Sequence, residues 1–258
     1  MPITLRIRNN FSDMVVIAGR CMRHAFRSID TIITVVAMPV LMMLMFVYVF
    51  GGAIHTGSAN YINYVVPGIV LMCIASGAPY TSVRLSSDIT TGIVDRFRSM
   101  PIAKSAILTG HVLTSVVFNM SSSVIVMLFA LLIGFRTGAG ITRWLLVIGI
   151  LLLFTLALTW LSVVFSLLAK TAEGAVLFSY PILILLFVSS AFTPTDSMHG
   201  ALRIFAENQP MTPIINAVRS LLINESAGSN ALTAVLWCVG ILIVSYIAAM
   251  IIYKRKTA

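Results

Sequence analysis

The chain has 258 residues, of which 59% are hydrophobic and only 10% are charged. A soluble globular domain carries roughly 25% charged residues, so this composition excludes an ordinary soluble domain and predicts one membrane domain without a large soluble appendage. The net charge of +9 is not gathered on a soluble module, which argues against a nucleic-acid-binding protein and fits a membrane protein with basic loops.

The amino-terminal region combines arginines with an amphipathic pattern. Between residues 14 and 29, apolar side chains recur at helical spacing on one face, while Arg20, Arg23 and Arg27 fall on another. This predicts an interfacial helix, with its apolar face in the acyl region and its cations toward anionic lipid headgroups. A cytoplasmic extension of the first membrane span is the alternative. No convincing cleavage site follows the first apolar run, so we expect that run to be retained as a span.

Six apolar stretches are long enough to cross a membrane. A crossing helix needs about 20 mostly apolar residues, and a helix satisfies the backbone polar groups that lipid cannot. None of the six stretches contains Asp, Glu, Lys, Arg or His. The sequence therefore predicts an all-α integral membrane protein with six transmembrane helices, at residues 31–50, 64–83, 112–135, 144–169, 174–192 and 231–253.

The basic residues predict how these spans are oriented. With six spans, thirteen of the 17 Lys and Arg residues fall on one side of the membrane, which is the side that holds both termini. The positive-inside rule places that side in the cytoplasm. Because the spans hold no ionisable residue, the pattern argues against a proton antiporter and a voltage sensor. Energy must then come from a partner, or transport must be passive.

Polar residues inside the spans are few and mild. The third span carries Asn119, Ser121 and Ser122, and the fifth ends with Ser189 and Ser190. Such residues either support helix packing or line a wet substrate pathway. The sequence has no GxxxxGK[ST] phosphate-binding loop, no Ser-His-Asp order and no metal-binding motif. We therefore expect no catalytic residue, no bound metal and no ATP hydrolysis by this chain.

The connection between the last two predicted spans, residues 193–230, is not a plain polar loop. Apolar residues recur at helical spacing on either side of residues 208–210, which read Asn-Gln-Pro. This predicts two short amphipathic helices, an outer hairpin that dips into or lies on the outer leaflet, with Thr212 as N-cap and Pro213 in the first turn of the second helix. A surface-lying external cap is the alternative.

The segment between the second and third predicted spans, residues 87–111, has a pattern that predicts a short amphipathic helix. Ile89, Ile93 and Phe97 would form its apolar face. Asp95, Arg96 and Arg98 would carry its charges, and Pro101 would end it. A short helix with an exposed aromatic residue at the membrane edge suits docking into a groove on another protein. An interfacial helix that binds lipid headgroups is the alternative.

Two stretches of sequence resemble a known family. Residues 92–101, which read GIVDRFRSMP, together with Leu108, Gly110 and His111, resemble the cytoplasmic loop of type-2 ABC exporter permeases. The stretch SSAFTP, which ends at Pro194, continues through residues 208–213, with Pro210 and Pro213, to Arg219. It resembles the region between the last two spans in the daunorubicin/doxorubicin-resistance branch of that family.

The resemblance implies a specific assembly. Residues 1–258 would form a single type-2 ABC transporter transmembrane domain with no nucleotide-binding domain. This permease would pair with a second copy of itself or a related permease, in contact with membrane lipids. Separate ABC ATPase subunits would bind ATP and Mg and dock against the coupling helix at residues 95–101, with Phe97 as the apolar anchor. The location would be a bacterial inner (cell) membrane, multi-pass, with both termini cytoplasmic.

Three functions are compatible with these patterns. The first hypothesis is an ATP-powered export permease for an amphipathic or lipophilic compound, such as a drug. The second is an exporter of the same family for a cell-envelope glycan or lipid-linked polymer. The third, from another class, is a passive channel or a membrane scaffold, because spans without charge permit passage of small neutral solutes.

Overall fold

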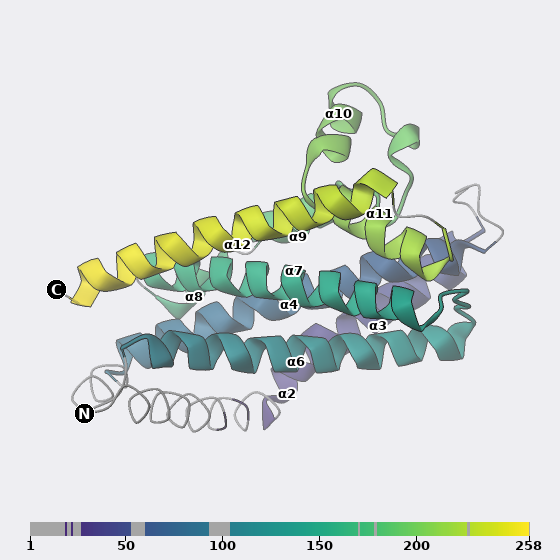
Figure 1. Cartoon of the computed structure of the whole chain (residues 1–258). Helices are drawn as coiled ribbons and strands as arrows, with labels where there is room; N and C mark the ends of the chain where they lie inside the picture. The colour runs from purple at the N-terminus through teal and green to yellow at the C-terminus, as the bar shows by residue number, and fades with distance from the viewer. Residues whose placement is uncertain are drawn as a thin grey trace.

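The computed structural model describes residues 19, 22, 27–52, 60–92, 104–169, 171–177, 180–225 and 228–257, and every regular element among them is helical. The long helices α4 (Tyr61–Thr90), α6 (Lys104–Ile133), α7 (Ile141–Leu168) and α12 (Gly228–Thr257) form an elongated bundle (Figure 1). One further apolar helix, which we call the first span, precedes them. It consists of α2 (Ile29–Ile32), η1 (Ile33–Ala37), α3 (Met38–Leu44) and η2 (Met45–Phe50).

The helices agree with five of the predicted spans. Five described helices are long and apolar enough to cross a membrane: the first span, α4, the part of α6 from Leu108, α7 and α12. The predicted span at 174–192 instead contains two shorter helices, α8 (Ala172–Leu177) and α9 (Tyr180–Phe187), followed by turns. Residues 178–179 between them lie outside the described residues, so the sixth span stays a prediction.

Pro39 explains an irregularity in the first span. Proline has no backbone N–H, so the carbonyl of Val35, four residues earlier, cannot receive its usual helical hydrogen bond. A π-helical segment, η1, precedes Pro39. The Val35 carbonyl accepts a hydrogen bond from the thiol of Cys73 in α4 instead, at 3.1 Å between sulfur and oxygen. Because Pro39 leaves the Val35 carbonyl without its usual helical donor, the thiol of Cys73 can connect α4 to the first span.

Helix α4 lies at the centre of the bundle. It contacts the first span, α6, α7, α8, α9 and α11, and among the long described helices it is the most enclosed. Two glycines allow this packing. A Cβ atom on Gly68 would lie 2.8 Å from the Cα atom of Ala191, and one on Gly77 would lie 1.7 Å from Oδ1 of Asn119. Each glycine therefore marks a close approach of another chain segment to α4.

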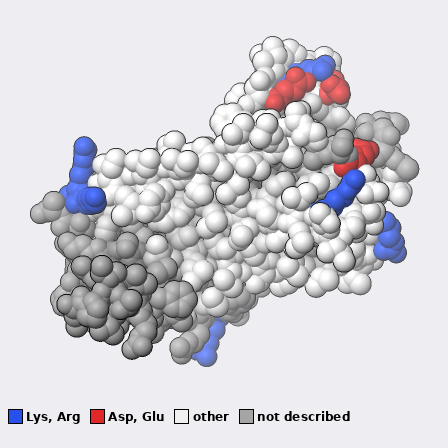
Figure 2. Space-filling model, in the orientation of Figure 1, with Lys and Arg blue, Asp and Glu red and all other residues white. Residues whose placement is uncertain are grey.

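The buried apolar side chains form two clusters. The larger one joins the first span, α4, α6, α7, α9 and α11. The smaller one joins α4, α6, α7 and α12 near their other ends, through Leu85, Leu108, Trp160 and Tyr253. In the view of Figure 2, the flank of the bundle carries almost no charge, and the charged side chains gather near its ends and on the α10 protrusion. Such an uncharged flank suits contact with lipid.

The predicted outer hairpin contains η3 (Thr195–Ser197), α10 (Ala201–Asn208) and α11 (Met211–Leu222). Helix α11 is largely buried against α4, α7 and α12, whereas α10 projects from the bundle and buries only Ala206 (Figure 1). The predicted N-cap at Thr212 is wrong. The helix begins two residues earlier than predicted, at Met211 with Pro210 as N-cap, and the Thr212 hydroxyl donates to the carbonyl of Ala206.

Candidate substrate cavity and outer polar cluster

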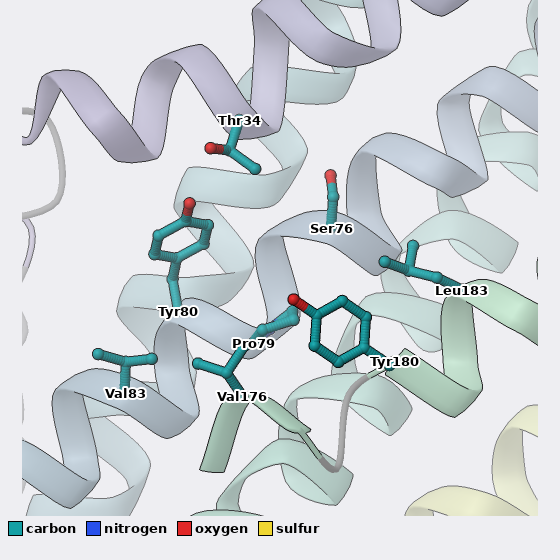
Figure 3. Close-up of a pocket in the computed structure, with 8 residues that line it drawn as sticks. All are labelled: Thr34, Ser76, Pro79, Tyr80, Val83, Val176, Tyr180 and Leu183. Atoms are coloured by element: carbon teal, nitrogen blue, oxygen red, sulfur yellow. The ribbon is translucent and has the colours of Figure 1, made fainter. Parts of the chain in front are cut away.

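A cavity of about 230 Å³ lies between the first span, α4, α8 and α9 (Figure 3). Two tyrosines stand in its wall: Tyr80 is directed toward Thr34, and Tyr180 toward Pro79. The remaining lining residues are Ser76, Val83, Val176 and Leu183. Among the described residues, the lining therefore combines apolar surface with four hydroxyl groups and carries no charged side chain.

The α4 side of this cavity follows from helical periodicity. Ser76, Pro79, Tyr80 and Val83 stand at positions i, i+3, i+4 and i+7, which fall on one face of a helix. That face meets the first span through Thr34 and α9 through Tyr180. Pockets of this kind, mostly apolar with a few polar groups, bind lipophilic molecules and orient them by hydrogen bonds. An ionised ligand would find no opposite charge in the part of this wall that the structure describes.

The polar patch predicted in the third span lies elsewhere, inside the helix packing. Asn119 is fully buried in α6, and its Nδ2 donates to the carbonyl and the hydroxyl of Ser115, at 3.0 and 3.1 Å. Its Oδ1 faces Gly77 and has no hydrogen-bond partner among the described residues. Ser122 is buried and Ser121 is partly buried. None of these side chains lines the cavity, and their role in a substrate pathway stays a prediction.

Arg219 organises a second polar site, which we call the outer polar cluster: Tyr64, Ser190, Asn216 and Arg219. The Arg219 guanidinium donates to the carbonyl of Tyr64 (3.0 Å), to Oδ1 of Asn216 (2.7 Å) and to the carbonyl of Ser190. The Tyr64 hydroxyl donates to the same Ser190 carbonyl, at 3.0 Å. The cluster therefore joins α4 and α11 to the chain that leaves α9.

The charge of Arg219 is stabilised by neutral groups. No described carboxylate pairs with it; its acceptors are two backbone carbonyls and an amide, and the Tyr64 ring lies below its guanidinium. Burial lowers the pKa of Arg219 from its ordinary value, and the contact with Tyr64 opposes this shift. Arginine ordinarily titrates above pH 12, so the side chain stays charged and keeps its acceptors in place.

The other predicted outer residues lie around this cluster. The hydroxyl of Ser189 donates to the carbonyl of Leu186, and that of Ser190 donates to Oδ1 of Asn216 at 2.8 Å. Pro194 precedes η3, Pro210 caps α11, and Pro213 is buried in its first turn. The structure thus brings Ser190 and Arg219 together. Sequence reasoning missed Tyr64 and Asn216, although Asn216 stands three residues before Arg219 on one helix face.

The predicted coupling residues lie outside the described residues: Ile93, Asp95, Arg96, Phe97, Arg98 and Pro101. The same holds for Arg20 and Arg23 of the predicted interfacial helix, whereas Arg27 is helical and exposed. The elements that flank the coupling segment are described. Nε2 of His111 in α6 lies 3.2 Å from Oδ2 of Asp88 in α4, so the two ends of that segment are held together.

The five long apolar helices among the described residues define a multi-pass helical membrane protein. Residues 13–223 match the family described as ABC-2 type transporter, and the chain belongs to that family. It is 29% identical over 233 residues to a daunorubicin resistance ABC transporter permease of Streptomyces coeruleorubidus, covering 88% of this chain and 81% of the relative.

Two further relatives are similar over most of their length. A probable doxorubicin resistance ABC transporter permease of Mycobacterium tuberculosis is 22% identical over 242 residues, covering 93% of this chain and 87% of the relative. A putative transport permease of Cyanophora paradoxa is 25% identical over 221 residues, covering 83% of this chain and 75% of the relative. The resemblance seen in the sequence motifs is thereby confirmed at the level of the family.

Proposed function

We propose that this chain is the permease subunit of an ABC exporter that moves an amphipathic or lipophilic compound out of the cell. Its membership in the ABC-2 type transporter family over residues 13–223 carries the proposal. Relatives named for daunorubicin and doxorubicin resistance support a drug-like cargo. The chain would cross a bacterial cell membrane six times, with both termini in the cytoplasm.

The cavity between Tyr80 and Tyr180 is the proposed cargo site. Two aromatic rings and an apolar wall favour a flat lipophilic molecule, and the hydroxyls of Thr34 and Ser76 favour one with a few hydrogen-bonding groups. A volume of about 230 Å³ holds part of a drug-sized molecule. The rest would extend through the open side of the cavity.

Energy for transport would come from a separate ABC ATPase, which would bind ATP and Mg. In this proposal the ATPase docks on residues 93–101, and a second permease, identical or related, completes the transporter. A signal from ATP moves the spans only if the two states of the ATPase contact them differently. The paired residues Asp88 and His111 lie where that signal would enter the bundle.

The test is ATP-dependent uptake of daunorubicin into inside-out proteoliposomes that contain this permease and its ATPase. Tyr180→Ala should raise the KM for the drug about tenfold, because an aromatic contact contributes on the order of 1 kcal/mol beyond its buried area. Tyr48→Ala removes a tyrosine of the first span that is 69% exposed and outside the cavity, and should leave the KM unchanged.

Other outcomes would identify the rival functions. Flux that persists without ATP would indicate a passive channel and contradict the proposal. ATP-dependent movement of a lipid-linked glycan, without movement of the drug, would keep the export role and replace the cargo. A KM that is equal in Tyr180→Ala, Tyr48→Ala and the unchanged protein would exclude the cavity as the cargo site.

A further inference from the structure

Two clefts meet beside α10, and they share no lining residue with the tyrosine-lined cavity. The polar cleft, about 470 Å³, lies between α10, α11 and α12, and the apolar cleft, about 530 Å³, lies between α9, α10 and α12. Asn208 and Trp237 line both clefts. The joined clefts therefore offer a polar and an apolar compartment to one molecule.

The apolar cleft is built from one face of α10. Ala201, Ile204, Phe205 and Asn208 stand at i, i+3, i+4 and i+7 and face Leu185 of α9 across the cleft. Ile204 and Phe205 are 65% and 50% exposed. An acyl chain between these side chains would remove apolar surface from water or from looser lipid contact. The charged residues of α10 lie outside this face.

The polar cleft presents both donors and acceptors. Oδ1 of Asn216 is held by Arg219 and Ser190, which leaves its Nδ2 as a donor. Nδ2 of Asn208 donates to the carbonyl of Ile204 at 2.8 Å, which leaves its Oδ1 as an acceptor. The cleft also contains the amide of Asn230 and the hydroxyls of Thr195 and Thr233. Both amide orientations are determined by their partners.

Gln209 is an independent sign of a missing partner. Its side chain is only 4% exposed, and its Nε2 donates to the carbonyls of Leu185 and Val188, at 2.8 and 3.2 Å. Its Oε1 is buried and has no hydrogen-bond partner among the described residues. Leaving a buried amide oxygen without a donor is unfavourable. Gln209 lines the apolar cleft next to Asn208, which lines both clefts. A headgroup hydroxyl at this junction would supply the missing donor once the enclosed Gln209 amide turns toward it.

The charge of the residues that line the clefts restricts which headgroup chemistry can bind there. Among the described residues that line the clefts, Glu207 alone is charged, and its carboxylate pairs with Arg203 at 2.8 Å. A phosphate only accepts hydrogen bonds and would meet this carboxylate. An ammonium group only donates, so it could not use Nδ2 of Asn216. A hydroxyl group both donates and accepts.

We infer that the joined clefts bind an amphiphile with a neutral, hydroxyl-rich headgroup, of the glycolipid class. The headgroup occupies the polar cleft and contacts the amides of Asn208 and Asn216, and an acyl chain lies against Ile204 and Phe205. This inference does not rest on the proposed export function, because binding requires neither the ATPase nor transport. The ligand is either a resident membrane lipid or a cargo on its way out.

The test uses Trp237, which stands where the two clefts meet. Trp144→Phe and Trp160→Phe leave it as the only one of the three tryptophans. This variant is placed in phosphatidylcholine nanodiscs that contain a small fraction of one brominated lipid. The brominated lipid is glucosyl diacylglycerol, phosphatidylglycerol or phosphatidylcholine. Half-maximal quenching of Trp237 should need about tenfold less glucosyl lipid than either phospholipid, as expected for two net hydrogen bonds.

Three further variants separate headgroup from chain. Asn208→Leu should remove the preference for the glucosyl lipid, while Ile204→Ala should weaken quenching by all three lipids alike. Leu202→Ala changes a residue of α10 that lines neither cleft and should have no effect. Equal quenching by the three lipids, or a preference that survives Asn208→Leu, would overturn the inference.

Addition of the ATPase and ATP distinguishes the two sources of the ligand. A fluorescent glucosyl lipid that changes leaflet on ATP hydrolysis is a cargo, and one that binds without changing leaflet is a resident lipid. Either result supports the site, provided that Asn208→Leu abolishes it. Drug transport that continues while glucosyl lipid fails to bind would refute this inference alone and leave the proposed function intact.

Discussion

The guanidinium carbon of Arg219 lies 3.7 Å from the centre of the Tyr64 ring, and both side chains donate a hydrogen bond to the carbonyl oxygen of Ser190. A cation above an aromatic ring is attracted by the electrons of its face, more strongly when water is excluded. The pair therefore connects α4, α11 and the chain after α9 through one charged group. Its removal takes the charged donor away from three acceptors, the carbonyls of Tyr64 and Ser190 and Oδ1 of Asn216.

Arg219→Ala should destabilise the protein, because each hydrogen bond to a charged group contributes about 1.5–3 kcal/mol. Arg219→Lys should recover only part of this loss, since an ammonium group cannot reach three acceptors in the planar fork of a guanidinium. Thermal unfolding in detergent measures both effects. Arg203→Ala is the control: Arg203 pairs with Asp196 and Glu207 in an exposed position, where ion pairs contribute at most about 1 kcal/mol. Equal midpoints for Arg219→Ala and Arg203→Ala would contradict the assignment.

Gly77→Ala should destabilise the contact between α4 and α6, because the new Cβ would overlap Oδ1 of Asn119. Overpacking of this kind typically costs about 1–3 kcal/mol. Gly240→Ala is the control, since nothing lies within 4 Å of that position and alanine favours a helix by about 1 kcal/mol. Opposite shifts in the unfolding midpoint are expected. In a double-mutant cycle, Asn119→Ala should remove most of the penalty of Gly77→Ala, and additive effects would exclude the overlap.

Asp88→Asn should weaken transport more than ATP hydrolysis, because Asp88 and His111 hold together the two ends of the predicted coupling segment. Loss of about 1–2 kcal/mol of pairing would lower ATP-driven transport about tenfold. The ratio of drug transported to ATP hydrolysed, measured in proteoliposomes with the ATPase, reports the effect. Asp30→Asn is the control, since Asp30 lies at the start of the first span and is not part of the Asp88–His111 pair. A ratio that stays constant in Asp88→Asn would reject the role.

Phe97→Ala should release the ATPase during gentle purification, because an apolar anchor buried at the centre of an interface can contribute 2 kcal/mol or more, roughly a thirtyfold change in affinity. Arg96→Glu should have a similar effect through charge. Arg255→Glu changes a cation at the end of α12 and should leave the complex intact. Recovery of a stoichiometric ATPase with Phe97→Ala would show that the complex docks elsewhere.

The transmembrane helices were predictable from the sequence because the surrounding lipid strongly restricts the structures that can cross a membrane. Lipid requires long apolar helices, so the runs that contain Val65, Phe129 and Leu151 predict the cores of α4, α6 and α7 directly. The different environments of α10 and α11 were not predictable. Both are amphipathic, and only the surrounding helices determine that α11 is buried while α10 projects from the bundle.

The polar sites depend on contacts between distant segments. Arg219 was singled out by a motif, but its partner Tyr64 stands 155 residues earlier. The tyrosine cavity likewise needs Tyr80 and Tyr180 from different helices. Thr212 followed a local rule for helix capping, yet its hydroxyl binds the carbonyl of Ala206 because α10 ends beside it. Local patterns predict which residues are unusual, and only the packing determines their partners.

Helix α4 runs for 30 residues, with Pro67 and Pro79 inside it, and is about 45 Å long at a rise of about 1.5 Å per residue. Tyr64, near one end, belongs to the Arg219 contact, and Asp88, near the other, contacts His111. At Gly68 and Gly77, which have no side chain, the neighbouring residues Ala191 and Asn119 pack directly against the α4 backbone. Tyr64 and Asp88 are about 36 Å apart along the helix axis, so a tilt of about 5° about one of them would shift the other by about 3 Å. One helix therefore joins the Asp88–His111 contact to the Arg219 contact, so a displacement of α4 at one of them would bear on the other.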